Sequence, residues 1–258
     1  IGARGDFLER ARALVEAGAD CLVIDIAHGH SQVMGRAIEA VRERFPDVQL
    51  IGGNVATGDG ALFLAERGVD AVKVGVGPGR GCRTRLETAV GVPQLQAIRE
   101  AWVAVGERVP IIADGGVVHD KDIFLALICG ASAVMLGSAL SGTDESPGLV
   151  IEDPSTHTKR KIYRGMTSPQ AVFETHYGDG NGELDDAVFD TPAEGQELQV
   201  PYKGAVADIL HRVRGHLRSA VSYAGETSLE AARRKIVPDP LRYLIPLSAA
   251  ARRESFDR

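Results

Sequence analysis

The sequence predicts an α/β fold, a parallel TIM (β/α)8 barrel from which the first strands are missing. Short β-branched apolar runs alternate with amphipathic helical stretches up to about residue 140, which is the pattern of repeated βα units on a parallel sheet. Polar or glycine-rich residues follow nearly every one of these runs. In a βα barrel those positions all face one mouth, where active sites are built, so the clustering favours the barrel.

Five strands are predicted, each nearly continuous in apolar residues, as expected of strands that are covered on both faces. They are CLVID (21–25), QLIGG (49–53), AVKVG (71–75), PIIAD (110–114) and AVMLG (133–137). Glycine-containing C-cap signals end the helices that we expect between them. These helices lie near 6–17, 31–45, 58–67, 92–104 and 120–129.

Five strands and a probable stub at residues 1–3 do not close an eight-stranded barrel of roughly 250 residues. An open doubly wound sheet is the alternative, but no GxGxxG motif follows the first strand, so the barrel is the better interpretation. The glycine- and acid-rich segment 174–197 is too polar to pack as an element and long enough to be a functional lid. A helix near 203–223 and a basic, apolar tail follow it.

Composition excludes several classes of partner and site. A formal net charge of −6 and a pI near 5.7 argue against binding to nucleic acid or to an anionic membrane surface. No apolar run reaches the roughly 18 residues of a membrane helix. Three cysteines without a CxxC pair indicate a reducing cytoplasm and no structural zinc, and His28 and His30 lack the spacing of a metal-binding pair.

Cys82 is the candidate nucleophile. It lies in a glycine-rich loop where backbone can approach a ligand closely, and cationic neighbours favour the reactive thiolate form. Those neighbours are Arg80, Arg83 and Arg85. Cys21 and Cys129 stand in apolar sequence and are expected to be small buried hydrophobic residues. Gly115–Gly116 and Gly137–Ser138 offer backbone N–H groups to a phosphate after the last two strands, where barrels commonly bind it.

Seven ordered motifs resemble those of the IMP dehydrogenase and GMP reductase family. They are DIAHGHS, GGNVAT, GVGPGRGCRTRLETAVGVPQ, IADGG, VMLGSALSGTDESPG, YRGMTS and VPYKG. The resemblance runs from residue 1 to about 225. It implies that a purine ribonucleotide binds across the barrel mouth, that Cys82 attacks C2 of its base to form a thioimidate adduct, and that hydride passes between C2 and a nicotinamide.

The activity expected first is oxidation of IMP to XMP with NAD⁺, supported by the long segment before Glu194. GMP reductase, which would deaminate GMP to IMP with NADPH, is the alternative. A catalytically weakened paralogue that binds a purine nucleotide is a second alternative, motivated by unusual residues in the cysteine loop.

The resemblance also implies roles for individual residues. Those expected to bind the nucleotide are Asp114, Gly116, Gly137, Ser138, Tyr163, Gly165 and Met166, with Arg80 at the position of a phosphate-binding serine. Those expected beside the nicotinamide are Asp25, Asn54 and Arg85. Thr84 and Glu194 match the polar pair that handles a proton. A monovalent cation, K⁺, would be held by the backbone of Gly77, Gly79 and Cys82, with Glu254 as a possible ligand from a neighbouring subunit.

This sequence departs from the family in its loop and flap. Arg80 replaces the serine before the cysteine, and Arg83 replaces the usual threonine after it. Dehydrogenases of the family carry an Arg-Tyr pair in the flap, whereas segment 174–193 contains no arginine. Either His176–Tyr177 substitutes for that pair, or the Thr84–Glu194 pair activates water alone. The tail keeps only Glu254–Ser255 of the family's terminal pattern.

The resemblance predicts how the chain is organised. Residues 1–258 would be the C-terminal part of a catalytic barrel domain, including the flap near 174–197, with the N-terminal strands and possible CBS modules outside this sequence. A cytoplasmic homotetramer is expected, with IMP, XMP or GMP as its nucleotide partners.

Overall fold

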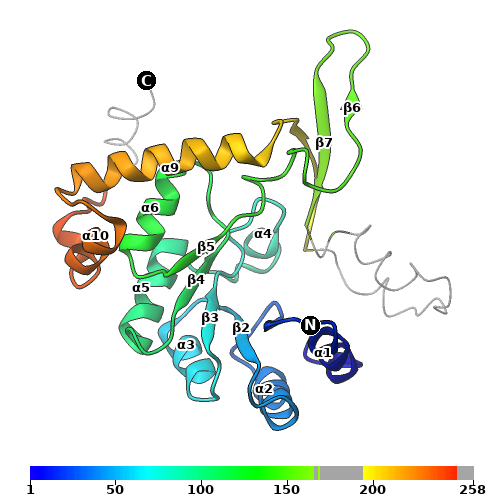
Figure 1. The fold of residues 1–258 in the computed structure, drawn as a ribbon, viewed down its shortest axis with the longest axis vertical. Coiled ribbons are helices and arrows are strands. Elements are labelled where there is room, and N and C mark those ends of the chain that lie inside the picture. Colours follow the sequence, from blue (N-terminus) through cyan, green and yellow to red (C-terminus); the bar gives the residue numbers. More distant parts are fainter. Residues whose placement is uncertain (166–167, 169–193, 249–258) are drawn as a thin grey trace.

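The computed structural model describes residues 1–165, 168 and 194–248. Helices and strands alternate through the first half, and a second, antiparallel group follows (Figure 1). The helices are α1 (Phe7–Glu16), α2 (Gln32–Arg44), α3 (Gly58–Ala65), α4 (Thr84–Thr88), α5 (Gln94–Val105), α6 (Asp120–Ile128), α9 (Val206–Tyr223), α10 (Leu229–Ile236) and the 3₁₀ turn Pro240–Arg242. The strands are β1 (Cys21–Asp25), β2 (Gln49–Val55), β3 (Ala71–Val74), β4 (Ile111–Asp114), β5 (Ala133–Met135), β6 (Ile151–Glu152), β7 (Lys159–Arg164) and β8 (Glu197–Pro201).

The first five strands form one parallel sheet in the order β1-β2-β3-β4-β5. All five strands predicted from the sequence are confirmed, with ends that shift by one or two residues. Strand order follows chain order, so the sheet has no reversal at which a doubly wound fold would bind its ligand. This sequential winding is that of a βα barrel, although the five described strands do not close on themselves.

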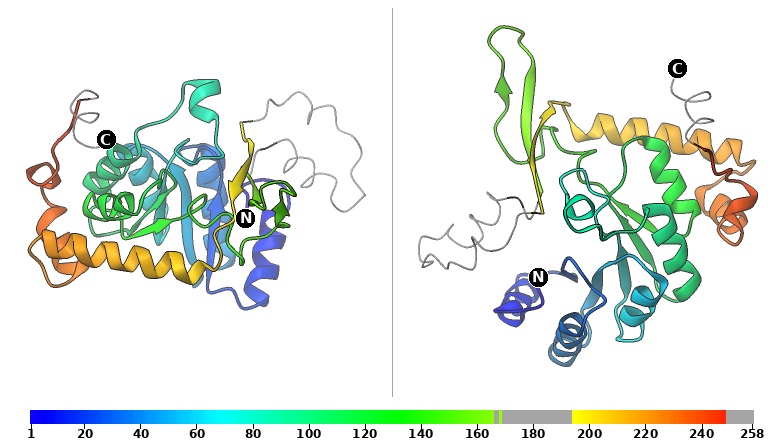
Figure 2. Two further views of the ribbon diagram at one scale, coloured as in Figure 1. Left: turned by 90° about the horizontal axis from the view of Figure 1, so that it is seen from above. Right: turned by 180° about the vertical axis from the view of Figure 1, so that it is seen from behind.

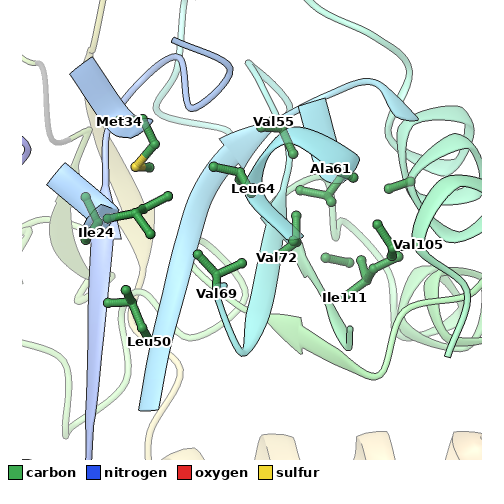
Figure 3. Close-up of a cluster of buried hydrophobic side chains, with 14 of the residues drawn as sticks. Ile24, Met34, Leu50, Val55, Ala61, Leu64, Val69, Val72, Val105 and Ile111 are labelled. Atoms are coloured by element: carbon green, nitrogen blue, oxygen red, sulfur yellow. The ribbon is translucent and has the colours of Figure 1, made fainter. Parts of the chain in front are cut away.

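The helices cover the outer face of this sheet, where the main hydrophobic core lies. Alternate strand residues point outward and are fully buried, among them Ile24, Leu50 and Val72. They pack against apolar side chains of the flanking helices, including Met34 of α2 and Leu64 of α3 (Figure 3). Burial of this apolar surface is the main force that orders the strands and so aligns their carboxyl ends.

The opposite, inner face of the sheet carries the polar groups. Strand register places Asp25 opposite Gly53, and Gly53 opposite Lys73, so these three residues form one row across β1, β2 and β3. Lys73 also pairs with Ile112, and Asp114 lies two residues further along β4 on the same face. Alternation of side chains along a strand therefore brings charged residues together at the barrel mouth.

The predicted strand stub at residues 1–3 is not a strand. The backbone of Ile1 nevertheless pairs with β1, because its amino group donates to Val23 O at 2.8 Å and its carbonyl accepts Asp25 N–H at 3.0 Å.

A second sheet, β6-β7-β8, is antiparallel and projects from the body of the molecule (Figure 2). The predicted lid, 174–197, lies outside the described residues except for its last four, 194–197. Residues 194–196 pack against the cysteine loop, and β8 begins at Glu197. Backbone pairing with β7 orders this polar sequence without requiring an apolar core.

Helix α9, predicted near 203–223, spans Val206–Tyr223 and packs beside α6. Ile209 and Val213 of α9 meet Ile123 and Leu127 of α6 in a small second core. None of the helices that the structure describes combines the length and apolarity that crossing a membrane requires.

Candidate active site

Three polar groups form a hydrogen-bonded relay that starts at Cys82. The Cys82 thiol lies 3.2 Å from the Thr84 hydroxyl, and this hydroxyl donates to Oε2 of Glu194 at 2.5 Å. Thr84 begins the short helix α4, which turns its side chain back toward the cysteine. The predicted pairing of Thr84 with Glu194 is thus present, and the predicted nucleophile Cys82 joins it.

Backbone pairing holds Glu194 against the cysteine loop. Cys82 and Gly195 form an antiparallel bridge, and Arg83 N–H donates to Glu194 O at 2.7 Å. Gln196 N–H donates to Gly81 O at 3.0 Å. The loop and the 194–196 segment therefore act as a short two-stranded ribbon, which holds the Glu194 backbone beside Cys82 while the Thr84 hydroxyl binds its carboxylate.

Gly165 completes this ribbon from β7. Its N–H donates to Gln196 O at 3.0 Å, and a Cβ at this position would collide with Gly81 O. Glycine is required because three backbone segments meet here with no space for a side chain. The predicted base-binding glycine and the predicted nucleophile are consequently in the same backbone cluster.

Tyr163 extends from β7 toward the same loop. An added Cβ on Gly137 would lie 3.2 Å from the Tyr163 hydroxyl, and one on Gly81 would lie 3.2 Å from its ring. Burial raises the pKa of Tyr163 above its ordinary value, against the opposing effects of a backbone hydrogen bond at Gly81 and of the Arg80 charge. The phenol is neutral at physiological pH and can donate a hydrogen bond to an anion.

A cavity of about 860 Å³ opens beside these groups. It begins at Gly79 and Arg80 in the cysteine loop and extends to α6 and α9. Most of the residues predicted to bind the nucleotide line it. These are Arg80, Asp114, Gly116, Gly137, Ser138 and Tyr163.

Lys203 also lines this cavity and was not predicted as a site residue. Its ammonium donates to Ser138 O at 2.8 Å and to Ala139 O at 3.0 Å, which holds the loop after β5. Burial lowers the pKa of Lys203, and the nearby charges of Arg80 and Arg212 lower it further. Cations that crowd one cavity repel each other, so an anionic ligand would relieve this repulsion. The VPYKG motif was the signal in the sequence.

The predicted cofactor-side and substrate-side residues share one hydrogen-bonded cluster. Asn54 Nδ2 donates to Asp114 Oδ2 at 3.0 Å and to Gly75 O at 2.7 Å. Lys73, which the sequence interpretation missed, forms ion pairs with both Asp25 and Asp114. Its signal was a lysine inside an otherwise apolar strand.

Arg85 connects the two ends of the cysteine loop. Its guanidinium donates to Val76 O at 3.0 Å and also to Val92 O, which joins the two ends of the loop. Added Cβ atoms on Gly77 or Gly91 would each lie 2.6 Å from Arg85 Cγ, so glycine leaves space for this clamp. Contact of Arg85 with a cofactor stays a prediction.

Two of the three arginines expected to favour the Cys82 thiolate are engaged by other groups. Arg83 turns to Glu87, with Nη2 and Oε1 2.6 Å apart, and Arg85 is engaged by carbonyl groups.

The other two cysteines differ in burial. Cys129 is buried as predicted. Cys21 is exposed, so the expectation that it is buried was wrong; its strand begins the sheet and places it at the edge.

The rings of His28 and His30 are 6.4 Å apart, and residues 1–165, 168 and 194–248 contain no group of three His, Cys, Asp or Glu side chains arranged to hold an ion. Four predicted site residues lie outside the described residues: Met166, His176, Tyr177 and Glu254.

Comparisons with known proteins agree with this geometry. The family model for the IMP dehydrogenase / GMP reductase domain matches residues 1–256. The chain belongs to this family.

Two relatives of this chain are named as inosine-5'-monophosphate dehydrogenases. The inosine-5'-monophosphate dehydrogenase of Nitrosopumilus maritimus is 49% identical over 228 residues, which is 87% of this chain and 47% of that protein. The enzyme of the same name from Aquifex aeolicus is 46% identical over 236 residues, covering 91% of this chain and 47% of its own length. The chain thus spans about half the length of the curated relatives it matches.

Among solved structures, a GMP reductase from Trypanosoma brucei in complex with guanosine 5'-monophosphate superimposes with a TM-score of 0.88 at 39% identity. The alignment covers 99% of this chain and 50% of that one. The predicted family and fold class are therefore confirmed.

Proposed function

We propose that this chain supplies the catalytic barrel of an IMP dehydrogenase, which oxidises IMP to XMP with NAD⁺ through a covalent adduct on Cys82. The observation that carries the proposal is the Cys82–Thr84–Glu194 relay beside Tyr163 and Gly165. A thiol, a proton-transfer pair and an anion-binding cavity are the parts that this reaction needs. The relatives named dehydrogenases support the direction of the reaction.

The cavity holds the nucleotide in this proposal. Tyr163 and Arg80 bind the phosphate together with backbone N–H groups near Gly116 and Ser138. The Asp114 carboxylate accepts hydrogen bonds from ribose hydroxyls. Gly165 leaves the base free to approach Cys82, because no side chain intervenes.

The first chemical step forms a bond between Cys82 Sγ and C2 of the hypoxanthine ring. Hydride then leaves C2, which oxidises the nucleotide and leaves a thioimidate on the enzyme. When NAD⁺ is bound, its nicotinamide supplies the hydride acceptor. Cys82 attacks as the thiolate, its proton having passed to solvent, and the relay beside it serves the hydrolysis that follows.

The second step is hydrolysis of the adduct. Water attacks C2, the C2–S bond breaks, XMP leaves and the thiol is restored. The Thr84 hydroxyl is placed to take a proton from that water and to pass its own to Glu194, to which it already donates. A further part of the proposal is that His176, which lies outside the described residues, assists as a base.

The residues beside the relay fit a nicotinamide cofactor. Asp25 is 56% exposed at the mouth and can accept a hydrogen bond from a carboxamide. Asn54 Oδ1 is buried and has no hydrogen-bond partner among the described residues, which suits a donor from a ligand. Asp25 and Asn54 would hold the cofactor, and Arg85 would support them through the loop.

Further parts of the proposal follow from family membership. Potassium would be bound by carbonyls of Gly77, Gly79 and Cys82; Gly79 O already accepts Cys82 N–H at 3.0 Å but keeps a second lone pair. A homotetramer in the cytoplasm is the expected assembly. The three free cysteines are compatible with a reducing compartment.

GMP reductase is the second candidate, favoured by the structural likeness to the Trypanosoma brucei enzyme. Only the fate of the adduct separates the two reactions, since the same pair would protonate departing ammonia. Near-ultraviolet absorbance of the reduced nicotinamide distinguishes them, with IMP plus NAD⁺ and GMP plus NADPH tested with and without potassium. Rising absorbance with IMP supports the dehydrogenase, and falling absorbance with GMP supports the reductase. Nucleotide binding without either turnover would support the weakened paralogue.

A further inference from the structure

Lys73 is a buried charge in the wall of the proposed site. Its side chain is 2% exposed, in the middle of β3 and on the inner face of the sheet. An ammonium group removed from water is tolerated only when charged or polar partners replace the lost hydration. Lys73 is too buried to contact a substrate, so its effect must pass through the residues that it touches.

Two carboxylates are those partners. Lys73 Nζ lies 2.5 Å from Asp114 Oδ2 and 3.2 Å from Asp25 Oδ1. Lys161, the other nearly buried lysine in the described part of the chain, shows a different arrangement, because its ammonium donates to the carbonyls of Thr143 and Ser146. Of these two lysines, only Lys73 forms ion pairs with acidic side chains, and those side chains face the active-site mouth.

Strand register explains how one lysine reaches both acids. Asp25, Gly53 and Lys73 form a row across three strands, so β2 separates the lysine from Asp25. A Cβ on Gly53 would lie 2.6 Å from Lys73 Cβ and 2.8 Å from Lys73 O. The glycine therefore opens the path along which Lys73 crosses to Asp25.

The contacts also orient the two carboxylates. Asp114 Oδ2 is occupied by Lys73 and by Asn54 Nδ2, which fixes the carboxylate plane and leaves Oδ1 for a ligand. Asp25 is bound at Oδ1 while over half of its side chain stays exposed. Asp114 lines the nucleotide cavity, and Asp25 lies at the predicted cofactor side.

We propose that Lys73 is a positioning residue that orients Asp114 toward the nucleotide ribose and Asp25 toward the nicotinamide cofactor, so that one buried cation serves both binding sites. This inference rests on the proposed function for the identity of the two ligands. Without the lysine, two like charges lie close together at the mouth of the site and repel each other, and neither keeps a fixed orientation.

A double-mutant cycle tests the proposal. IMP affinity is measured by calorimetry for the wild-type protein, Lys73→Met, Asp114→Asn and the double variant. We expect Lys73→Met to weaken IMP binding about tenfold or more, and Asp114→Asn to cost at least about fivefold less in the Lys73→Met background than in wild type. A second cycle combines Lys73→Met with Asp25→Asn and measures the KM for NAD⁺ in place of IMP affinity. This cycle tests the cofactor side. Lys73→Arg, which keeps the charge, should restore part of the affinity.

The matched control is Lys161→Met, which removes a buried lysine that has carbonyl partners. Its effect on IMP binding should be additive with that of Asp114→Asn, because it does not touch the acid. If Lys73→Met does not fold, Lys73→Gln takes its place in the cycle. Additive effects of Lys73→Met and Asp114→Asn on IMP binding would overturn the proposal.

The free energy of unfolding without ligand separates this inference from the proposed function. If wild-type protein binds no IMP, the proposed function fails. The coupling between Lys73 and Asp114 is then obtained from the free energies of unfolding of the same variants. Non-additive unfolding would confirm that Lys73 holds the acids. Additive unfolding would show that the contact is incidental.

Discussion

The hydroxyl of Thr84 donates to the carboxylate of Glu194 across 110 residues of sequence, with 2.5 Å between the two oxygens. The same hydroxyl lies 3.2 Å from the sulfur of Cys82. One threonine therefore connects the proposed nucleophile to a carboxylate, which is the connection that a step of proton transfer at the proposed adduct requires.

The relay predicts a specific defect when it is broken. Thr84→Val should slow steady-state turnover by about a hundredfold, while the first burst of NADH is kept, because hydride transfer precedes hydrolysis. Rapid-mixing absorbance measures both phases. Thr88→Val is the control, since Thr88 lies on the same helix and its hydroxyl bonds to the backbone. Loss of the burst in Thr84→Val would place the residue in hydride transfer instead.

Tyr163 predicts a binding defect. Tyr163→Phe removes the neutral phenol that faces Gly137 and should raise the KM for IMP about tenfold, as expected for one lost hydrogen bond to a charged group, with a small change in kcat. Steady-state kinetics measures the split. Tyr202→Phe, whose hydroxyl bonds to Asp144 on the surface, is the matched control. A fall in kcat at constant KM would contradict a role in phosphate binding.

Arg85 predicts that the loop loses order when its clamp is removed. Arg85→Met leaves Val76 O and Val92 O without their donor and should lower kcat/KM about tenfold or more, because Cys82 is no longer held in place. Amide hydrogen exchange should rise across residues 76–92. In Arg83→Met, which breaks an exposed pair with Glu87, exchange should stay near the wild-type level. Equal exchange in both variants would show that Arg85 does not fasten the loop.

Asp120 predicts a pH dependence of stability. A hydrogen bond from Arg212, together with one from His216, holds the pKa of Asp120 below its ordinary value, despite the opposing effect of burial. A lowered folded-state pKa stabilises the fold above the ordinary carboxyl range, and this stabilisation is lost as pH falls through the folded-state pKa.

Asp120→Asn should therefore cost about 1 kcal/mol of unfolding free energy near pH 7, and the difference from wild type should shrink as pH falls through the folded-state pKa of Asp120. Urea unfolding at several pH values checks this. Glu230→Gln, which breaks an exposed pair with Arg234 on α10, should change stability less. A loss for Asp120→Asn that is the same at every pH would exclude the carboxylate as its source.

The parallel sheet could be predicted because its physics is local. Each strand is a short apolar run between helical segments, and the burial that orders it shows directly in the sequence. Strands β6 to β8 could not be predicted in this way. Nearly half of their residues are charged and most are exposed, and pairing along the backbone orders them instead.

The candidate site could likewise be predicted only in part. Cys82 was recognisable from its loop, whereas the Thr84–Glu194 pair beside it depends on a ribbon between distant segments, and only the family resemblance indicated it. Lys73 was counted as part of an apolar strand. Its role became visible once strand register placed it beside Gly53 and opposite two acids.

The most direct test of the account is peptide mapping by mass spectrometry after acid quench of the protein during turnover of IMP with NAD⁺. We expect a purine nucleotide attached to the peptide that contains Cys82, absent in Cys82→Ala and unchanged in Cys129→Ala. Turnover of IMP by Cys82→Ala, or a nucleotide found on Cys21 or Cys129 instead, would contradict it.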